Sequence, residues 1–146
     1  MSISDVTPPT EPRPDFNKSG IKQSLRDEAA RRRADVHAVR SDAAGAALAV
    51  RFLDAFSGRL SGRVVSVYWP MRDEIDVRGL IGALATAGAQ VVLPVMAGAD
   101  LPLVFREWRA GDELLPGAFG VREPADDARV LTPDNVVAPL LAFDVA

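Results

Sequence analysis

A strand pattern gives way to a loop pattern within the stretch Val64-Val65-Ser66-Val67-Tyr68-Trp69-Pro70-Met71-Arg72-Asp73-Glu74-Ile75-Asp76. The β-branched residues at its start predict a buried strand from Val64 to Trp69. Pro70 cannot extend a ladder of backbone hydrogen bonds, and the acidic residues after it predict a loop that opens into a helix. In alternating α/β chains, ligands bind just beyond the carboxyl ends of the strands. The acidic loop is therefore a candidate binding site.

The residues after this loop predict a strand–helix–strand unit. A helix is expected from Asp76 to Ala87, with Gly88 at its end. A second buried strand is expected over Gln90–Val95, where Pro94 and the following loop end it. Two apolar strands joined by a helix are typical of a parallel sheet with a right-handed crossover.

The C-terminal third predicts two further strands with an irregular segment between them. Leu103–Trp108 alternates in polarity, which indicates an outer strand. Residues 109–135 are rich in Gly, Pro and Asp and are expected to hold little regular structure. Val136–Phe143 is expected to be the last buried strand.

The N-terminal third predicts a tail and a pair of helices. Residues 1–17 contain several prolines and no helix or strand pattern, so a disordered tail is expected. Apolar and alanine residues fall on one helical face between Ile21 and Arg33. Asp35 can cap a second helix that runs to about Phe56, and Gly58 follows it. The inner face of this helix is expected to hold Val36, Val39, Leu48, Phe52 and Phe56.

Composition limits the classes of function. A length of 146 residues favours one domain, and the net charge of −3 gives no electrostatic reason to bind nucleic acid or an anionic membrane. The absence of cysteine excludes disulfides and thiolate chemistry, and the single histidine, His37, excludes a multi-histidine metal site. No apolar run approaches the roughly 20 residues of a membrane span, and the N-terminus lacks a secretory signal pattern. A cytoplasmic protein is expected.

Short motifs occur in an order that resembles one enzyme family. They are Lys22-Gln23-Ser24-Leu25-Arg26, Tyr68-x-Pro70 with Glu74-Ile75-Asp76, Val92-Leu93-Pro94-Val95, Leu103 to Trp108, Gly117-x-Phe119-Gly120-Val121-x-Glu123-Pro124, Pro133-Asp134 and Pro139-Leu140-Leu141-Ala142-Phe143-Asp144. Each motif is weak alone, but their shared order and spacing over residues 18 to 144 resemble 5-formyltetrahydrofolate cyclo-ligase, also called 5,10-methenyltetrahydrofolate synthetase.

The resemblance implies a fold and a reaction. The fold is α/β, a three-layer, Rossmann-like arrangement of a mostly parallel sheet with flanking helices. The reaction closes a ring on 5-formyltetrahydrofolate with ATP and Mg²⁺: the formyl oxygen is phosphorylated, N10 attacks the activated carbon, and phosphate leaves. Such chemistry requires positioning and charge neutralisation, so no residue is expected to act as a nucleophile or as a metal ligand.

The resemblance assigns two cations to ATP. Lys22 and Arg26 match positions that hold nucleotide phosphates, and a spacing of four residues places them on one helical face. The alternative for this pair is a solvated basic face. Arg31, Arg32 and Arg33 are expected to lie in solvent, because three consecutive side chains point in different directions.

The resemblance also assigns three residues to the folate. Glu74 matches a glutamate that binds the pterin or the N5–N10 region, where a carboxylate suits N–H donors. Trp69 and Phe119 match positions that line the folate pocket, and ordinary core packing is the alternative for both. Asp76 is expected to be the N-cap of the following helix. In the same reading, Tyr68 and Trp108 are core residues and His37 is an exposed helix residue.

The end of the chain departs from the family pattern. After Phe143-Asp144, family members continue with a Gly-rich segment that cradles ATP phosphates, whereas this sequence stops at Val145-Ala146. Residues 18–146 are therefore expected to form an incomplete cyclo-ligase domain that lacks its C-terminal part. An uncovered sheet would favour self-association. The alternative function is a non-catalytic truncated homologue that retains at most folate binding.

Overall fold

The computed structural model describes residues 18–56 and 58–143, so the expected tail at 1–17 lies outside the described residues. The elements in chain order are α1 (Lys18–Phe56), β1 (Val64–Ser66), α2 (Arg78–Thr86), β2 (Gln90–Met96), β3 (Leu103–Glu107), β4 (Leu114–Pro116), the 3₁₀ turn η1 (Ala118–Gly120), β5 (Arg122–Pro124) and β6 (Asn135–Val136).

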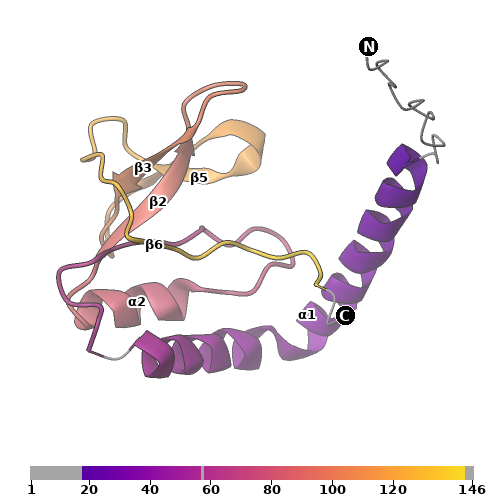
Figure 1. Cartoon of the computed structure of the whole chain (residues 1–146), viewed down its shortest axis with the longest axis horizontal. Helices are drawn as coiled ribbons and strands as arrows, with labels where there is room; N and C mark the ends of the chain where they lie inside the picture. The colour runs from indigo at the N-terminus through magenta and orange to yellow at the C-terminus, as the bar shows by residue number, and fades with distance from the viewer. Residues whose placement is uncertain (1–17, 57, 144–146) are drawn as a thin grey trace, which may run out of the picture.

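Four strands form the main sheet, in the order β3-β2-β1-β6. β1 is parallel to β2, with Val65 opposite Val91, and parallel to β6, with Val65 opposite Asn135. β3 runs antiparallel to β2 at one edge, which confirms the predicted outer strand. The expected α/β fold with a mostly parallel sheet and flanking helices is thus confirmed (Figure 1).

The centre of this sheet forms the core. Val65 and Val67 are fully buried, and so are Ser66 and Val92, whose side chains point to the opposite face. Burial on both faces explains why these strands are continuous apolar runs instead of alternating ones. α2 buries Leu80, Ile81 and Leu84, and lies between the sheet and the second half of α1 (Figure 1).

β2 is longer than the sequence indicated, because Pro94 does not end it. The strand continues through Pro94 to Met96, and Pro94 lies opposite Phe105 of β3. Pairing between β1 and β2 ends at Ser66, which lies opposite Val92. No residue of β1 lies opposite Pro94, so the missing N–H of Pro94 leaves no carbonyl of β1 without a donor.

The two ends of α2 agree only in part with the sequence signals. The helix begins at Arg78 and its N-cap is Val77, so the predicted start at Asp76 and the prediction of Asp76 as N-cap are wrong. Asp76 still contacts the first turn, because its Oδ1 accepts the Arg78 N–H at 2.9 Å. At the other end Gly88 has φ +81°, and its N–H bonds to the Ala85 carbonyl. This left-handed conformation confirms Gly88 as the residue that ends the helix.

The predicted pair of N-terminal helices is wrong, because α1 is one continuous helix of 39 residues. Asp35 lies inside it, exposed, and does not begin a second helix. The residues around Asp35 include neither Gly nor Pro, so nothing interrupts the backbone hydrogen bonds there. Figure 1 shows instead that α1 bends, so that its two halves run in different directions.

Only the second half of α1 covers the core. Leu48, Phe52 and Phe56 pack against the buried cluster, as predicted, whereas Val36 and Val39 of the expected inner face are exposed. Gly45 is buried where α1 meets the loop before α2: a Cβ at this position would lie 2.4 Å from the Asp76 carbonyl oxygen. The helix can approach the loop this closely only because residue 45 is glycine.

The C-terminal third differs most from expectation. Residues 109–135 contain the antiparallel hairpin β4–β5, so the segment is more regular than predicted. The predicted buried strand Val136–Phe143 is wrong: pairing with β1 ends at Val136, and Leu140 and Phe143 are 71% and 79% exposed. Pro139 interrupts the apolar run and has no N–H for a ladder. No helix in the described part of the chain has the length and apolarity to cross a membrane.

Candidate functional site

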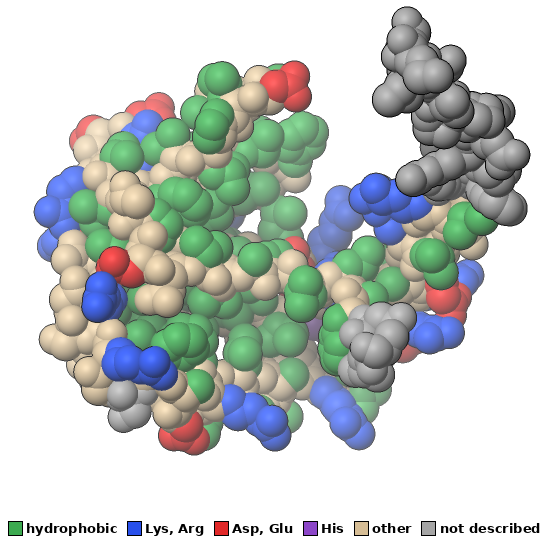
Figure 2. Space-filling model, viewed as in Figure 1, with side chains coloured by type: hydrophobic (Ala, Val, Ile, Leu, Met, Phe, Trp, Pro, Cys, Tyr) green, Lys and Arg blue, Asp and Glu red, His purple; other side chains and the backbone are tan. Residues whose placement is uncertain are grey.

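A cavity of about 630 Å³ lies between α1, the loop from β1 to α2, and the segment after β6. Its walls are the face of α1 between Ala29 and Leu48, the loop residues Tyr68 and Asp73 to Ile75, and residues 137–143. Most of these walls are apolar. Figure 2 shows the molecule hollowed between its main body and the first half of α1, where Lys and Arg side chains gather. The cavity lies beyond the carboxyl end of β1, where the sequence predicted a site.

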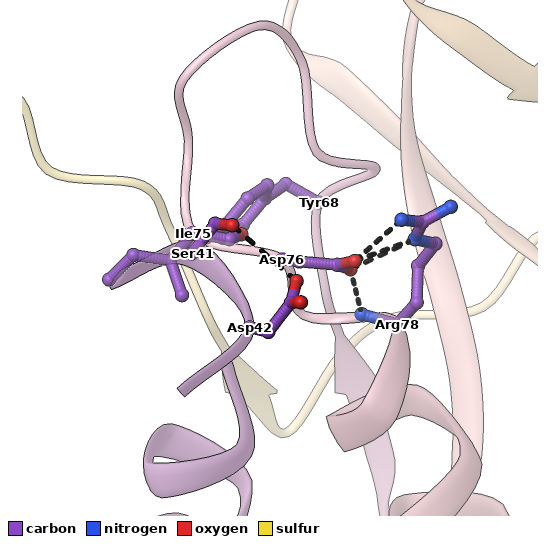
Figure 3. Close-up of polar contacts among 6 residues, drawn as sticks. All are labelled: Ser41, Asp42, Tyr68, Ile75, Asp76 and Arg78. Carbon is purple, nitrogen blue, oxygen red and sulfur yellow. Dashed lines mark hydrogen bonds and ion pairs between the residues drawn. The ribbon is translucent and has the colours of Figure 1, made fainter. Parts of the chain in front are cut away.

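Hydrogen bonds within the loop fix its shape. The Tyr68 hydroxyl donates to the Ile75 carbonyl at 2.9 Å (Figure 3). Within the turn, the Glu74 N–H donates to the Met71 carbonyl at 3.0 Å, and the Met71 N–H donates to Glu74 Oε2 at 2.9 Å. The Glu74 carboxylate is therefore held by its own turn, half-buried in the cavity wall.

An ion pair joins this loop to α1. Arg33 Nε and Nη2 donate to the two carboxylate oxygens of Asp73 at 2.9 and 3.1 Å. The two side chains are only 26% and 20% exposed. The hydrogen bonds from Arg33 lower the pKa of the Asp73 carboxyl, and those to Asp73 raise the pKa of Arg33. This bidentate contact fixes the distance between the two walls of the cavity.

The prediction that Arg33 lies in solvent is therefore wrong, and His37 is half-buried instead of exposed. Both residues line the cavity. A sequence signal was present, since Ala29, Arg33, His37 and Ser41 are spaced by four and share one helical face. Arg31 and Arg32 are exposed, as predicted, and both pair with Glu28, although Arg32 also lines the cavity.

Two groups beside Glu74 have shifted acidity. Burial, followed by the charge of Glu74, raises the pKa of Tyr68 to about 12, so its hydroxyl remains a hydrogen-bond donor at neutral pH. Asp76 binds the Arg78 guanidinium as well as its N–H (Figure 3), and the guanidinium lowers the pKa of the Asp76 carboxyl.

The remaining predicted site residues lie outside the walls of this cavity. Lys22 and Arg26 are exposed on the first half of α1. Trp69 is half-buried and contacts the buried core residue Trp108 edge-on, with ring centroids 5.4 Å apart. Phe119 is 84% exposed in η1, so core packing does not explain it. Of the five predicted ligand contacts, the structure thus places Glu74 in the cavity wall.

The fold is that of known folate enzymes. The 5,10-methenyltetrahydrofolate synthetase structure from Aquifex aeolicus superposes with a TM-score of 0.66 at 22% identity, covering 85% of this chain and 63% of that one. The 5,10-methenyltetrahydrofolate synthetase from Mycoplasma pneumoniae superposes with a TM-score of 0.60 at 13% identity, covering 84% and 65%.

Sequence comparison identifies the family directly. The 5-formyltetrahydrofolate cyclo-ligase of Mycolicibacterium smegmatis is 35% identical over 94 residues, which are 59% of this chain and 48% of that protein. The chain thus spans about half the length of this curated relative. The sequence model of the 5-formyltetrahydrofolate cyclo-ligase family matches residues 18–146. The chain therefore belongs to the 5-formyltetrahydrofolate cyclo-ligase family.

Proposed function

We propose that this chain acts in the ATP-dependent cyclisation of 5-formyltetrahydrofolate to 5,10-methenyltetrahydrofolate, with phosphorylation of the formyl oxygen and attack by N10, in the cytoplasm. Family membership supports the reaction class. The observation that carries the assignment to a site is the cavity beside β1, with the Glu74 carboxylate fixed in its wall.

The cavity suits a flat, partly apolar ligand with N–H groups. Apolar walls from α1 and residues 137–143 would cover ring surfaces. Glu74 would accept N–H donors from the pterin or the N5–N10 region, and its own turn holds it in one orientation. The neutral Tyr68 hydroxyl already bonds to Ile75, so it stabilises the loop while Glu74 binds. Positioning of this kind is the main requirement of ring closure.

Trp69 and Phe119 remain proposed folate contacts outside the cavity wall. Phe119 presents an exposed aromatic face at the tip of the β4–β5 hairpin. An aromatic face can stack on a pterin or aminobenzoyl ring. Trp69 packs on Trp108, so any ligand contact it makes would use the part of the indole that remains exposed.

Lys22 and Arg26 fit the proposed role in ATP binding. Both are exposed and lie one turn apart on the same helical face, so two cations can converge on one polyphosphate. ATP would supply the phosphoryl group that activates the formyl oxygen. The described residues contain no cluster of three or more His, Asp or Glu side chains for a metal ion. Mg²⁺ enters the proposal as the ion carried by the ATP phosphates.

The test is ATP-dependent formation of the methenyl product from 5-formyltetrahydrofolate, followed by absorbance. We expect turnover by the purified chain and at least a tenfold loss in Glu74→Gln, which removes the charge and keeps the shape. Glu113→Gln, at an exposed glutamate just before β4, is the matched control. Equal activity in Glu74→Gln and the wild type would contradict the assignment of the site.

A second candidate is folate binding without turnover. It is favoured by one observation: Glu74 lies in the cavity wall, whereas Lys22 and Arg26 do not. Saturable quenching of tryptophan fluorescence by 5-formyltetrahydrofolate, with no ATP-dependent product, would identify a binding protein. Absence of both signals from folded protein would contradict both candidates.

A further inference from the structure

The β4–β5 hairpin is a separate two-stranded sheet. Leu114 lies opposite Pro124 and Pro116 lies opposite Arg122, and no ladder connects this pair to the four-stranded sheet. An isolated two-stranded hairpin is at best marginally stable in water. Its orientation must therefore come from side chains that join it to the main sheet.

One such side chain is Glu123 on β5. Its Oε1 accepts the Met96 N–H at 3.1 Å, at the end of β2. Two further bonds hold the base of the hairpin: Trp108 Nε1 donates to the Asp112 carbonyl, and Arg106 donates to the Ala125 carbonyl. Glu123 lies nearer the tip than either, so it restrains the part of the hairpin that carries η1.

Gly117 accommodates the Glu123 side chain. A Cβ on Gly117 would lie 2.3 Å from Cδ and 2.4 Å from Oε2 of Glu123. The φ of Gly117 is −102°, which other residues adopt, so a side chain at this position would displace the Glu123 carboxyl group without straining the backbone. The carboxyl group of Glu123 thus occupies the volume of the missing side chain.

The loop between β4 and β5 carries Phe119, whose backbone conformation is unusual. Phe119 has φ +56°, in the left-handed region, and is 84% exposed. Hydrogen bonds from Gly117 N–H to the Val121 carbonyl and from Val121 N–H to the Ala118 carbonyl close the loop around it. A bulky residue in this conformation is strained and persists only where its surroundings hold it, and such residues cluster at ligand sites.

We propose that Glu123 is a positioning residue, which docks the hairpin on the end of β2 against Gly117 and so holds Phe119 in place to contact the folate. This inference rests on the proposed function. Glu123 acts through Phe119 and does not itself touch the ligand. The Met96 N–H requires only an acceptor oxygen, so glutamine can replace glutamate.

The first experiment compares single variants in the full chain. The dissociation constant for 5-formyltetrahydrofolate is measured by tryptophan fluorescence, and amide exchange is measured at Met96 and residues 117–121. Glu123→Ala is expected to weaken folate binding about tenfold and to speed exchange. Glu123→Gln should restore both values to within about twofold, because it keeps the acceptor oxygen. Glu113→Ala, which removes an exposed charge immediately before β4, is the control.

The second experiment uses double variants. Gly117→Ala should displace the Glu123 carboxyl and weaken binding as Glu123→Ala does. In the double variant Gly117→Ala/Glu123→Ala, the Glu123 carboxyl that would clash with the new methyl group is absent. The folate Kd of this double variant should therefore be no higher than that of Glu123→Ala alone. Likewise Glu123→Ala should add nothing to Phe119→Ala if Glu123 acts through Phe119.

Each alternative result is decisive. An unchanged Kd in Glu123→Ala with faster exchange would show that the hairpin contact is merely structural and would overturn the proposal. Additive effects in the double variants would overturn it as well. Wild-type protein that binds no folate would overturn the proposed function, and this inference with it. Failure of the proposed function is thus seen in the wild type alone, whereas failure of this inference is seen only when the variants are compared with a wild type that binds folate.

Discussion

Arg33 on α1 and Asp73 on the loop after β1 are joined by two hydrogen bonds of 2.9 and 3.1 Å, across 40 positions of sequence. The contact lies beside Glu74 and connects α1, which carries Lys22 and Arg26, with the loop that carries Glu74. Its electrostatics and geometry lead to the first of five predictions.

Asp73→Asn should destabilise the protein by about 1 kcal/mol at neutral pH, because it leaves Arg33 without its charged partner. The pKa of Asp73 is lowered by folding, so the stabilisation is full above the ordinary aspartate value of 3.8. It is lost as the pH falls from there through the lower pKa of the folded state. Denaturant unfolding from pH 7 to pH 3 should show the gap between wild type and variant closing. Asp54→Asn, at an exposed aspartate of α1, is the control, and a gap that widens on acidification would contradict the prediction.

Gly45→Ala should destabilise the protein by about 2 kcal/mol, although alanine is the better helix former. The new methyl group would lie 2.4 Å from the Asp76 carbonyl oxygen, so α1 and the loop must separate. Gly82→Ala in α2 is the matched comparison, because no heavy atom lies within 4 Å of its added Cβ. It should stabilise by about 1 kcal/mol. Thermal and denaturant unfolding would measure both, and shifts of the same sign would contradict the packing at Gly45.

Tyr68 should titrate with a pKa of about 12 in the folded protein. It is the single tyrosine of the chain, so the absorbance of tyrosinate reports it alone. In denaturant the midpoint should return to the ordinary value of 10.0. Because folding raises this pKa, the stability that neutral Tyr68 contributes is full below pH 10 and is lost as the pH rises towards 12. A folded-state midpoint near 10, with circular dichroism unchanged, would contradict the burial.

Lys22→Ala and Glu74→Gln should separate the two substrates. Lys22→Ala should raise the KM for ATP about tenfold and leave the folate Kd unchanged, since Lys22 lies outside the cavity wall. Glu74→Gln should raise the folate Kd and leave the KM for ATP unchanged. Steady-state kinetics and fluorescence titration measure the two effects, and Arg31→Ala, at an exposed cation of the same helix, is the control. An identical pattern in both variants would argue against separate sites.

Self-association should occur through the segment after β6. Leu140 and Phe143 are largely exposed, and in the described part of the chain β6 pairs only with β1. Exposed apolar side chains beside an open strand edge favour pairing with another chain. Sedimentation velocity should show oligomers that dissociate on dilution, and Leu140→Asp should shift the population towards monomer. A monomer at all concentrations would contradict this.

The centre of the fold could be predicted from sequence because its signals are local. Consecutive β-branched residues in β1, the apolar run of β2 and Gly88 after α2 each mark an element without reference to the rest of the chain. The acidic loop could be placed beside a cavity because loops at the carboxyl ends of parallel strands have a known position, whereas only the family resemblance singled out Glu74 within it.

The predictions that proved wrong have two causes: a local signal that did not decide the structure, and contacts between residues far apart in the sequence. Asp35 has the chemistry of a helix cap, but no neighbouring residue breaks the helix, so the cap signal was misleading. Arg33 belongs to a basic run, and only the position of Asp73, fixed by the fold, brings it out of solvent. Val136–Phe143 has strand composition, but strand pairing ends where β1 offers no further partner.

The register between β1 and β6 has a consequence for how the chain folds. Val64 donates its N–H to Asp134 Oδ2, a partner 70 positions later, whereas β1, α2, β2 and β3 occupy the continuous stretch 64–107. The nearby elements close short loops and should assemble first, and β6 must close a much longer one. During synthesis from the N-terminus, one edge of β1 therefore has no partner until residue 134 has left the ribosome. We expect this unpaired edge to favour aggregation in that interval, until the two-residue strand β6, Asn135–Val136, pairs with β1.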